Sequence, residues 1–214
     1  MVEKTCAVRW HRRAESRSEE ILQAAIDVLW EKGFRATRLD DVAAKAGVTK
    51  PLIYHYFEGK DDLVHKAMEW KLSHVISDMR FERDGSGAQW EDRLRAVCTW
   101  QWQRWCSPEW GRLQHVVLSE MRQEAPDLYR KWILQTFDRR NKVVEEILRD
   151  AHSDLRSGID PESSARFLIA GLRQLAQVHA CGGDLAEKQA KLDAMLETSL
   201  DVFIHGIRKP MEAG

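Results

Sequence analysis

The chain has few cysteines and no long apolar run. Its four cysteines are Cys6, Cys98, Cys106 and Cys181, and no two of them form a CxxC pair. This spacing indicates neither a zinc site nor a disulfide framework, so we interpret them as free thiols, with a redox-sensing pair of Cys98 and Cys106 as the alternative. No apolar segment approaches the length of a membrane span, and the N-terminus lacks the apolar core of a signal peptide. The sequence therefore predicts a cytoplasmic protein.

Recognisable catalytic motifs are also missing. The sequence contains no glycine-rich phosphate loop, no nucleophile elbow and no carboxylate pair in a catalytic setting. Its histidines are scattered without the spacing of metal ligands. We therefore expect that the chain is not an enzyme and that it binds no cofactor and no metal.

Charge is balanced over the whole chain but not at its start. The net charge of −1 does not indicate a polyanionic partner by itself. Residues 1–17, however, carry five basic and two acidic side chains. A basic arm over residues 1–16 can reach the phosphate backbone or the minor groove when it precedes a DNA-binding unit. A solvated, partly disordered tail is the other interpretation.

The pattern of apolar residues predicts an all-α protein. Glycine and proline fall mainly between segments of helical periodicity, and no alternating run indicates a sheet. We expect a first helix over about 18–32, two short helices over 38–45 and 50–56, and a fourth from about Asp61. Further helices are expected at about 88–105, 108–122, 126–151, 161–181 and 185–208.

The two short helices form a predicted helix-turn-helix. Leu39, Val42, Ala43 and Ala46 have the spacing of a buried helical face, and Gly47 occupies the turn, where a left-handed residue is favoured. The residues expected at the helix starts are Thr37, as a cap with Asp40 as its reciprocal partner, then Thr49, as the second cap, and Pro51, in the first turn.

The segment GVTKPLIYHYF, followed by GKDDL, is similar to the signature of the TetR-type bacterial transcriptional regulators. Leu52 departs from it, because the family often has a small polar residue there. The resemblance implies a DNA-binding domain over 17–62 and a ligand-binding and dimerisation domain over 63–210. It implies a homodimer on a palindromic DNA operator, usually as a repressor. The residues expected to contact DNA are Thr37, Arg38, Thr49, Lys50, Pro51, Leu52, Tyr54, His55, Tyr56 and Lys60.

Nine tryptophans are many for a chain of this length, and five lie between positions 90 and 110. Large rings in the second domain can line a site for an apolar or aromatic small-molecule effector, and a cationic effector is also compatible with ring faces. Filling of the hydrophobic core is the alternative role. The residues predicted to line the site are Trp70, Trp100, Trp105, Trp110, Val117, Met121 and Phe137.

The last two predicted helices are the most amphipathic segments. Each carries apolar residues on more than one side, so each needs more than one covering surface. In the TetR-type family such helices form the dimer interface, whereas packing inside the subunit is the alternative. The predicted interface residues are Leu168, Leu172, Leu175, His179, Leu196, Ser199 and Phe203.

A protein of another class remains compatible with these observations. A helical small-molecule-binding protein, or a helical enzyme with an unrecognised site, would share the composition and the helical pattern. Salt-dependent retention on DNA distinguishes the regulator from both.

Overall fold

The computed structural model describes residues 3–86, 89–107, 110, 118–179 and 185–210, and it is all-α there apart from one isolated antiparallel bridge between Leu155 and Arg208. This confirms the predicted fold class. In chain order, the helices are α1 (Glu3–Ala36), α2 (Leu39–Ala46), α3 (Lys50–Tyr56), α4 (Lys60–Gly85), α5 (Trp90–Trp105), α7 (Ser119–Glu124), α8 (Pro126–Asp150), the 3-10 turn η2 (His152–Asp154), α9 (Pro161–His179) and α10 (Leu185–Ile207).

The chain divides into two compact units. The first comprises Met1–Ser73 and Arg112–Leu134, and the second comprises His74–Gly111 and Gln135–Gly214. Both α4 and α8 contribute residues to each unit. No helix in the described ranges has the length and apolarity needed to cross a lipid bilayer.

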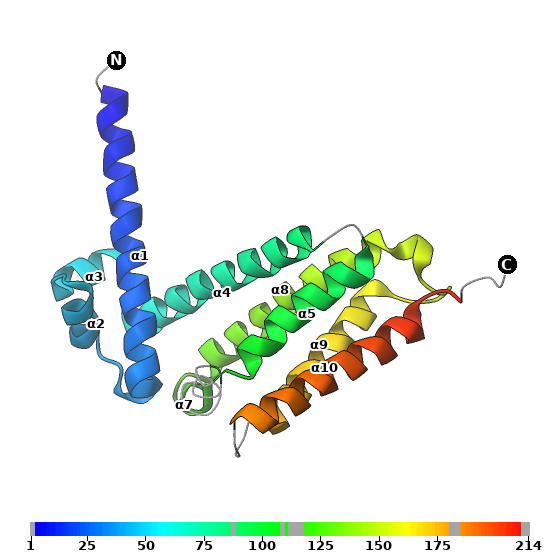
Figure 1. The fold of residues 1–214 in the computed structure, drawn as a ribbon. Helices are drawn as coiled ribbons and strands as arrows, with labels where there is room; N and C mark the ends of the chain where they lie inside the picture. Colours follow the sequence, from blue (N-terminus) through cyan, green and yellow to red (C-terminus); the bar gives the residue numbers. More distant parts are fainter. Residues whose placement is uncertain (1–2, 87–88, 108–109, 111–117, 180–184, 211–214) are drawn as a thin grey trace. The chain divides into compact units, whose positions relative to one another are not determined.

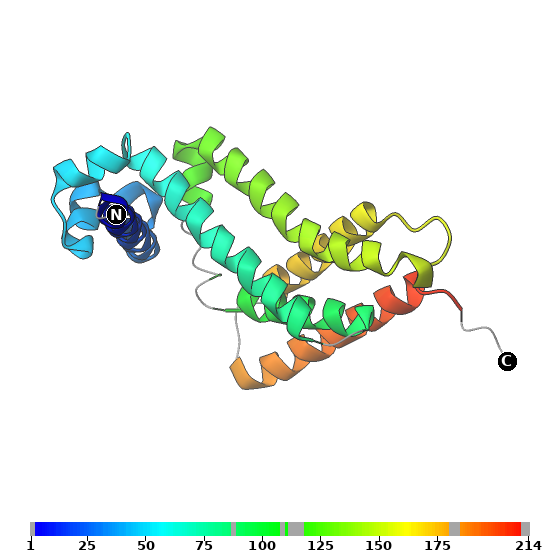
Figure 2. The same cartoon turned by 90° about the horizontal axis from the view of Figure 1, so that it is seen from above.

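In the first unit, α1 packs against α2, and α2 packs against α3 (Figure 1). Figure 2 looks nearly along α1, with α2 and α3 beside it. The helix begins at Glu3 instead of Ser18, so most of the predicted arm is helical. Residues 3–17 contain neither glycine nor proline and are rich in alanine, arginine and glutamate, which favour helix. The predicted stop at Gly33 is a break within α1, because Gly33 has a non-helical φ of 81° and the helix continues to Ala36.

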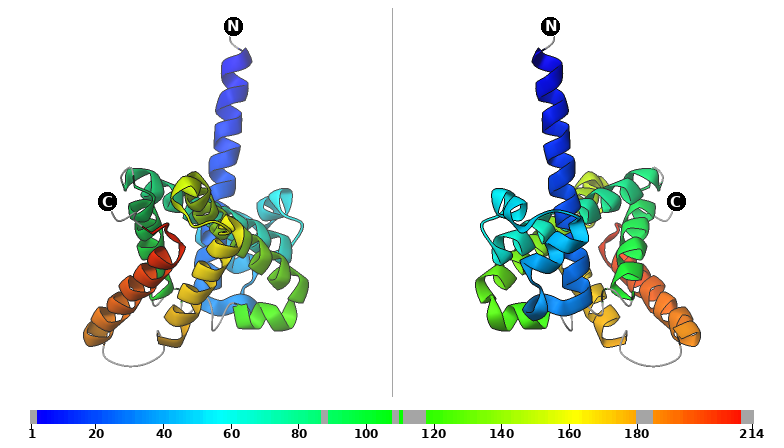
Figure 3. Two further views of the ribbon diagram at one scale, coloured as in Figure 1. Left: turned by 90° about the vertical axis from the view of Figure 1, so that its right-hand side faces the viewer. Right: turned by 90° about the vertical axis from the view of Figure 1, so that its left-hand side faces the viewer.

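In the second unit, α5, α9 and α10 pack against one another (Figure 3). Their apolar stripes form the core of this unit, and Trp102 of α5 is as fully buried as Trp105. Because both sides of the last turns of α5 are covered, this helix contributes more than a single face to the core.

The core of the second unit also contains most of the residues predicted for the dimer interface. Leu168, Leu172, Leu196 and Phe203 are buried within their own subunit, so the prediction that they form a free interface is wrong. Leu175 and Ser199 are half-buried, and the side chain of His179 lies outside those described. The physical reason is that these stripes are the most apolar faces of α9 and α10, and the subunit uses them to close its own core.

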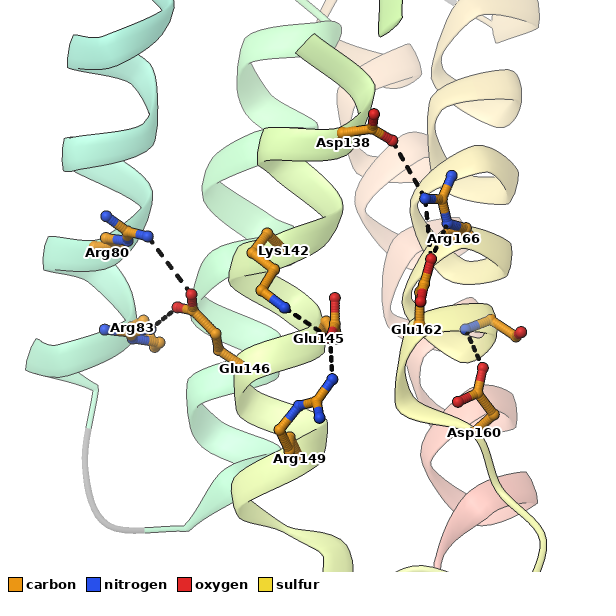
Figure 4. Close-up of polar contacts among 11 residues, drawn as sticks. Arg80, Arg83, Asp138, Lys142, Glu145, Glu146, Arg149, Asp160, Glu162 and Arg166 are labelled. Atoms are coloured by element: carbon orange, nitrogen blue, oxygen red, sulfur yellow. Dashed lines mark hydrogen bonds and ion pairs between the residues drawn. The ribbon is translucent and has the colours of Figure 1, made fainter. Parts of the chain in front are cut away.

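Ion pairs connect α8 with its neighbours at the surface of the second unit (Figure 4). Glu146 lies 2.7 Å from Arg83 of α4, and Asp138 lies 3.3 Å from Arg166 of α9. Exposed pairs of this kind contribute little free energy, about 0–1 kcal/mol each. Four acidic side chains of α8, namely Asp138, Glu145, Glu146 and Asp150, have a cationic partner.

Candidate nucleic-acid interface

The turn between α2 and α3 has the predicted left-handed glycine. Gly47 has φ 63° and ψ 34°, and its N–H donates to the carbonyl of Ala44 at 3.3 Å. The N–H of Val48 donates to the carbonyl of Ala43 at 3.0 Å. These bonds satisfy carbonyl groups at the end of α2 and reverse the chain within a few residues. Ile53 of α3 is fully buried below the turn.

The start of α2 differs from the prediction. Arg38, not Thr37, is the N-cap residue, and it has no side-chain capping bond. Thr37 is only 2% exposed, and its hydroxyl donates to the Gly33 carbonyl at 2.6 Å. The predicted reciprocal pairing of Thr37 with Asp40 is therefore wrong, and Thr37 is too buried to contact DNA. The Thr37 hydroxyl binds the Gly33 carbonyl and not a group of α2. Gly33 has a positive φ at the break in α1, and its buried carbonyl needs a donor.

One side of α3 is free and the other is buried. Tyr54 is 54% exposed, and Pro51 and His55 are also exposed on the same side of the helix, whereas Ile53 and Phe57 are buried. Thr49 is the N-cap residue, as predicted, although its side chain makes no capping bond, and Pro51 lies in the first turn. A short helix that shows one polar and aromatic face to solvent can enter a major groove.

The other predicted contact residues lie around this face. Arg38 and Thr49 are exposed, while Leu52 and Tyr56 are half-buried. The His55 and Tyr56 rings meet edge to face, with centroids 5.1 Å apart. Such a contact restricts the side-chain rotamers and fixes the direction of the donors.

Lysines at each end of α3 have partners within the first unit. Lys50 Nζ lies 3.0 Å from the Asp40 carboxylate of α2. Lys60, the first residue of α4, places Nζ 4.4 Å from the centroid of the Phe34 ring and 3.4 Å from the Arg35 carbonyl oxygen. An ammonium group has three N–H donors, and neither lysine is fully buried.

The residues predicted to line an effector site fall in different units. Trp70 and Met121 belong to the first, and Trp100, Trp105, Trp110 and Phe137 belong to the second. Trp105 and Met121 are fully buried, whereas Trp70, Trp100, Trp110 and Phe137 are half-buried. Val117 lies outside the described residues. The set as a whole stays a prediction, and the tryptophans of the second unit are its largest group.

Sequence reasoning missed the buried polar side chains beside these tryptophans. Gln101, Thr136, Arg140 and Asn141 are all buried in the second unit. Arginine in an amphipathic helix is normally read as part of the solvated face, so Arg140 gave no signal. Gln101 did give a signal of burial in the sequence, because it shares the apolar side of its helix with Trp105.

Two cysteines of the second unit, Cys98 and Cys106, lie where the thiolate form is disfavoured. Burial raises the pKa of the Cys98 thiol to about 12. Burial, with the nearby Asp193 carboxylate, raises the pKa of Cys106 to about 11. Since the thiolate is the reactive form, both thiols are unreactive at neutral pH.

A short helix that is exposed on one side and joined by a tight turn to a second helix is the arrangement of helix-turn-helix DNA-binding proteins. Comparison with known proteins agrees with this class. Residues 21–67 match the family model described as "Bacterial regulatory proteins, tetR family". The helix-turn-helix segment of the chain is thus similar to the DNA-binding domain of the TetR family of bacterial transcriptional regulators.

The similarity extends beyond this domain in some relatives. The transcriptional repressor KstR2 of Rhodococcus jostii is 25% identical over 207 residues, which cover 91% of this chain and 92% of KstR2. The regulator YvdT of Bacillus subtilis is 32% identical over 79 residues, which cover 37% of this chain and only 41% of YvdT. A TetR-family regulator from Mesorhizobium loti has a similar fold, with a TM-score of 0.76 at 20% identity, covering 92% of this chain and 99% of that chain.

Proposed function

We propose that this chain is a ligand-responsive transcriptional repressor that binds a palindromic DNA operator as a homodimer. The observation that carries the proposal is the exposed face of α3, which Tyr54 and His55 form above a buried anchor at Ile53. A regulator of this kind acts by occupying DNA and needs no enzymatic activity. It also works in the cytoplasm, where its operator is.

In this proposal, α3 lies in the major groove. Tyr54 and His55 present hydrogen-bonding groups and ring edges to the bases, while Lys50 and Lys60 meet phosphates. Arg38 and Thr49 are exposed beside α3 and extend the phosphate contacts. Phosphate contacts supply affinity for any sequence, and contacts at base edges supply the preference for the operator.

The proposed dimer uses the faces of α9 and α10 that the subunit leaves exposed. Phe167 is 75% exposed on α9, and Val202 is 70% exposed on α10. Gly171 follows Phe167 by one turn, with open space around its Cα, as does Gly206 after Val202. Large apolar side chains beside small ones allow a second copy to approach closely, and a stable dimer would bury roughly 2,000 Å² or more in total.

Release from DNA would follow from binding of a small molecule in the second domain. A ligand can shift the equilibrium only by binding one conformation more tightly than the other. The tryptophans Trp100, Trp105 and Trp110 support an effector with an apolar or aromatic body.

An electrophoretic mobility assay with the DNA upstream of the chain's own coding region tests this function. We expect a discrete complex that excess unrelated duplex does not displace. His55→Ala should reduce the preference for this DNA, whereas His152→Ala, an exposed histidine of the second unit, should leave it unchanged. The proposal is wrong if the native chain binds neither this DNA nor unrelated duplex at low salt.

A further inference from the structure

Arg140 of α8 is a buried cation in the second unit. Its side chain belongs to a residue only 6% exposed, and its Nε has no hydrogen-bond partner among the described residues. An arginine carries five N–H donors and accepts no hydrogen bond. Taking such a charge out of water without a partner is strongly unfavourable, and buried charges are therefore normally paired.

The carboxylates nearest to Arg140 in sequence do not compensate it. Asp138 pairs with Arg166 at 3.3 Å, and Glu146 pairs with Arg83 at 2.7 Å (Figure 4). Glu145 binds a lysine and an arginine of its own helix. The acidic groups of this half of α8 are thus committed to other cations.

The surroundings of Arg140 are positive. Burial, followed by the charges of Arg173 and Arg104, lowers the pKa of Arg140 to about 9, so it still carries its proton at neutral pH. The ring of Trp110 lies against the guanidinium, with the centroid 5.1 Å from Cζ. A ring face attracts a cation, but it offers no lone pair in the plane of the N–H donors.

Other buried polar atoms of the second unit also lack partners in the described part of the chain. Thr136 precedes Arg140 by one turn of α8 and therefore lies on the same side, and its hydroxyl has no hydrogen-bond partner in the described part of the chain. Gln101 is fully buried on α5, one turn before Arg104, and its amide is likewise unpartnered within those ranges. Arg140 and Thr136 can donate to an anion, and the indole ring of Trp110 can contact an apolar body.

We propose that the second unit binds an organic carboxylate, with Arg140 as the residue that holds the carboxylate group and Trp110 in contact with its apolar part. This inference rests on the proposed function and specifies its effector as an anion. A carboxylate is an acceptor with about four lone-pair positions, and it matches the guanidinium fork in shape and charge. A carboxylate therefore supplies both the acceptors and the missing negative charge.

Matched pairs of ligands test this proposal: benzoate with benzamide, 1-naphthoate with 1-naphthamide, and octanoate with octanamide. Each pair shares its apolar body and differs in its head group, which is an anionic carboxylate in one member and a neutral amide in the other. Binding to the native chain is followed by tryptophan fluorescence. We expect the carboxylate of at least one pair to bind more tightly than its amide by about 10- to 100-fold, the range for a hydrogen-bonded charge.

Two variants assign the preference to Arg140. Arg140→Met should abolish the carboxylate preference, and it should raise the melting temperature of the free protein, because an unpaired buried charge is replaced by an apolar side chain of similar volume. Arg139→Met, at the exposed neighbouring position, should retain the preference. Arg140→Lys keeps the charge without the planar fork and should give an intermediate preference.

The opposite results overturn the inference. If no pair shows a preference, or if the preference survives in Arg140→Met, then Arg140 does not hold a carboxylate. A lower melting temperature in Arg140→Met without a change in ligand preference would mean that Arg140 serves the packing of Trp110. In each case, DNA binding measured on the same preparations shows whether the proposed regulator function stands.

Discussion

Lys50 Nζ lies 3.0 Å from the carboxylate of Asp40, which ties the start of α3 to the first turn of α2. The pair is exposed, so it adds little to stability. The pair matters for DNA binding because Lys50 belongs to α3, the helix proposed to contact DNA, and its ammonium group lies beside the Asp40 carboxylate.

Removing the anion should strengthen DNA binding. We expect Asp40→Asn to raise the affinity for any duplex by about two- to fivefold at low salt, since a surface pair contributes up to about 1 kcal/mol. Fluorescence anisotropy with labelled duplex measures this. Asp41→Asn is the matched control, because Asp41 pairs with Lys32 of α1 instead. Equal gains in both variants would mean that Lys50 does not act at the DNA.

The left-handed turn should be intolerant of a side chain. Gly47→Ala forces a Cβ into a conformation with φ 63°, which costs roughly 1–2 kcal/mol. We expect a loss of about 1 kcal/mol in the free energy of unfolding in urea. Gly85→Ala, at the end of α4 and without a positive φ, should change it by less than about 0.5 kcal/mol. Equal stability of the two variants would contradict the turn geometry.

The dimer face can be tested with two phenylalanines of similar exposure. Phe167 of α9 is 75% exposed and Phe81 of α4 is 77% exposed. Phe167→Glu should weaken dimerisation by about tenfold or more, because it places a charge in the centre of an apolar contact, whereas Phe81→Glu should leave the dimer intact. Sedimentation velocity over a concentration series measures both. A Phe167→Glu chain that dimerises like the native chain would exclude this face.

The cysteines should react only at high pH. With pKa values of about 12 for Cys98 and about 11 for Cys106, only about one thiol in a thousand or fewer is a thiolate at pH 8. In a Cys6→Ser/Cys181→Ser background, we expect slow alkylation by iodoacetamide at pH 8 and a steep increase towards pH 11. Rapid labelling at pH 7, together with loss of DNA binding, would restore the redox-sensing alternative.

The DNA-binding unit could be predicted well because its signals are local. Gly47 marks the turn, and Ile53 marks the buried side of α3, by rules that need only neighbouring residues. The capping prediction failed at Thr37 because its hydroxyl donates to the carbonyl of Gly33, four residues earlier, instead of capping α2. The positive φ of Gly33 gave no sign of this in the sequence.

The second unit was harder to predict because its signals depend on tertiary packing. Periodicity identified the apolar stripes of α9 and α10, but it could not distinguish the core of one subunit from the contact between two. Leu172 proved to be core, and the exposed Phe167 lies outside the predicted stripe. The burial of Arg140 could not be predicted for a related reason, since no local rule identifies a charged side chain that the fold buries.

Salt dependence of DNA binding tests the central claim most directly. The native chain, Lys60→Ala and Lys66→Ala are titrated with operator-containing and unrelated duplex from low to moderate salt. Lys66 is the control because it lies on the same helix as Lys60 but is not among the predicted DNA-contacting residues.

We predict that log K falls linearly with log salt for the native chain, as phosphate contacts require. Lys60→Ala should bind both duplexes more weakly by the same factor and reduce the slope by about one. Lys66→Ala should behave as the native chain does. Binding that does not respond to salt, or no binding to either duplex, would contradict the assignment of this chain as a DNA-binding regulator.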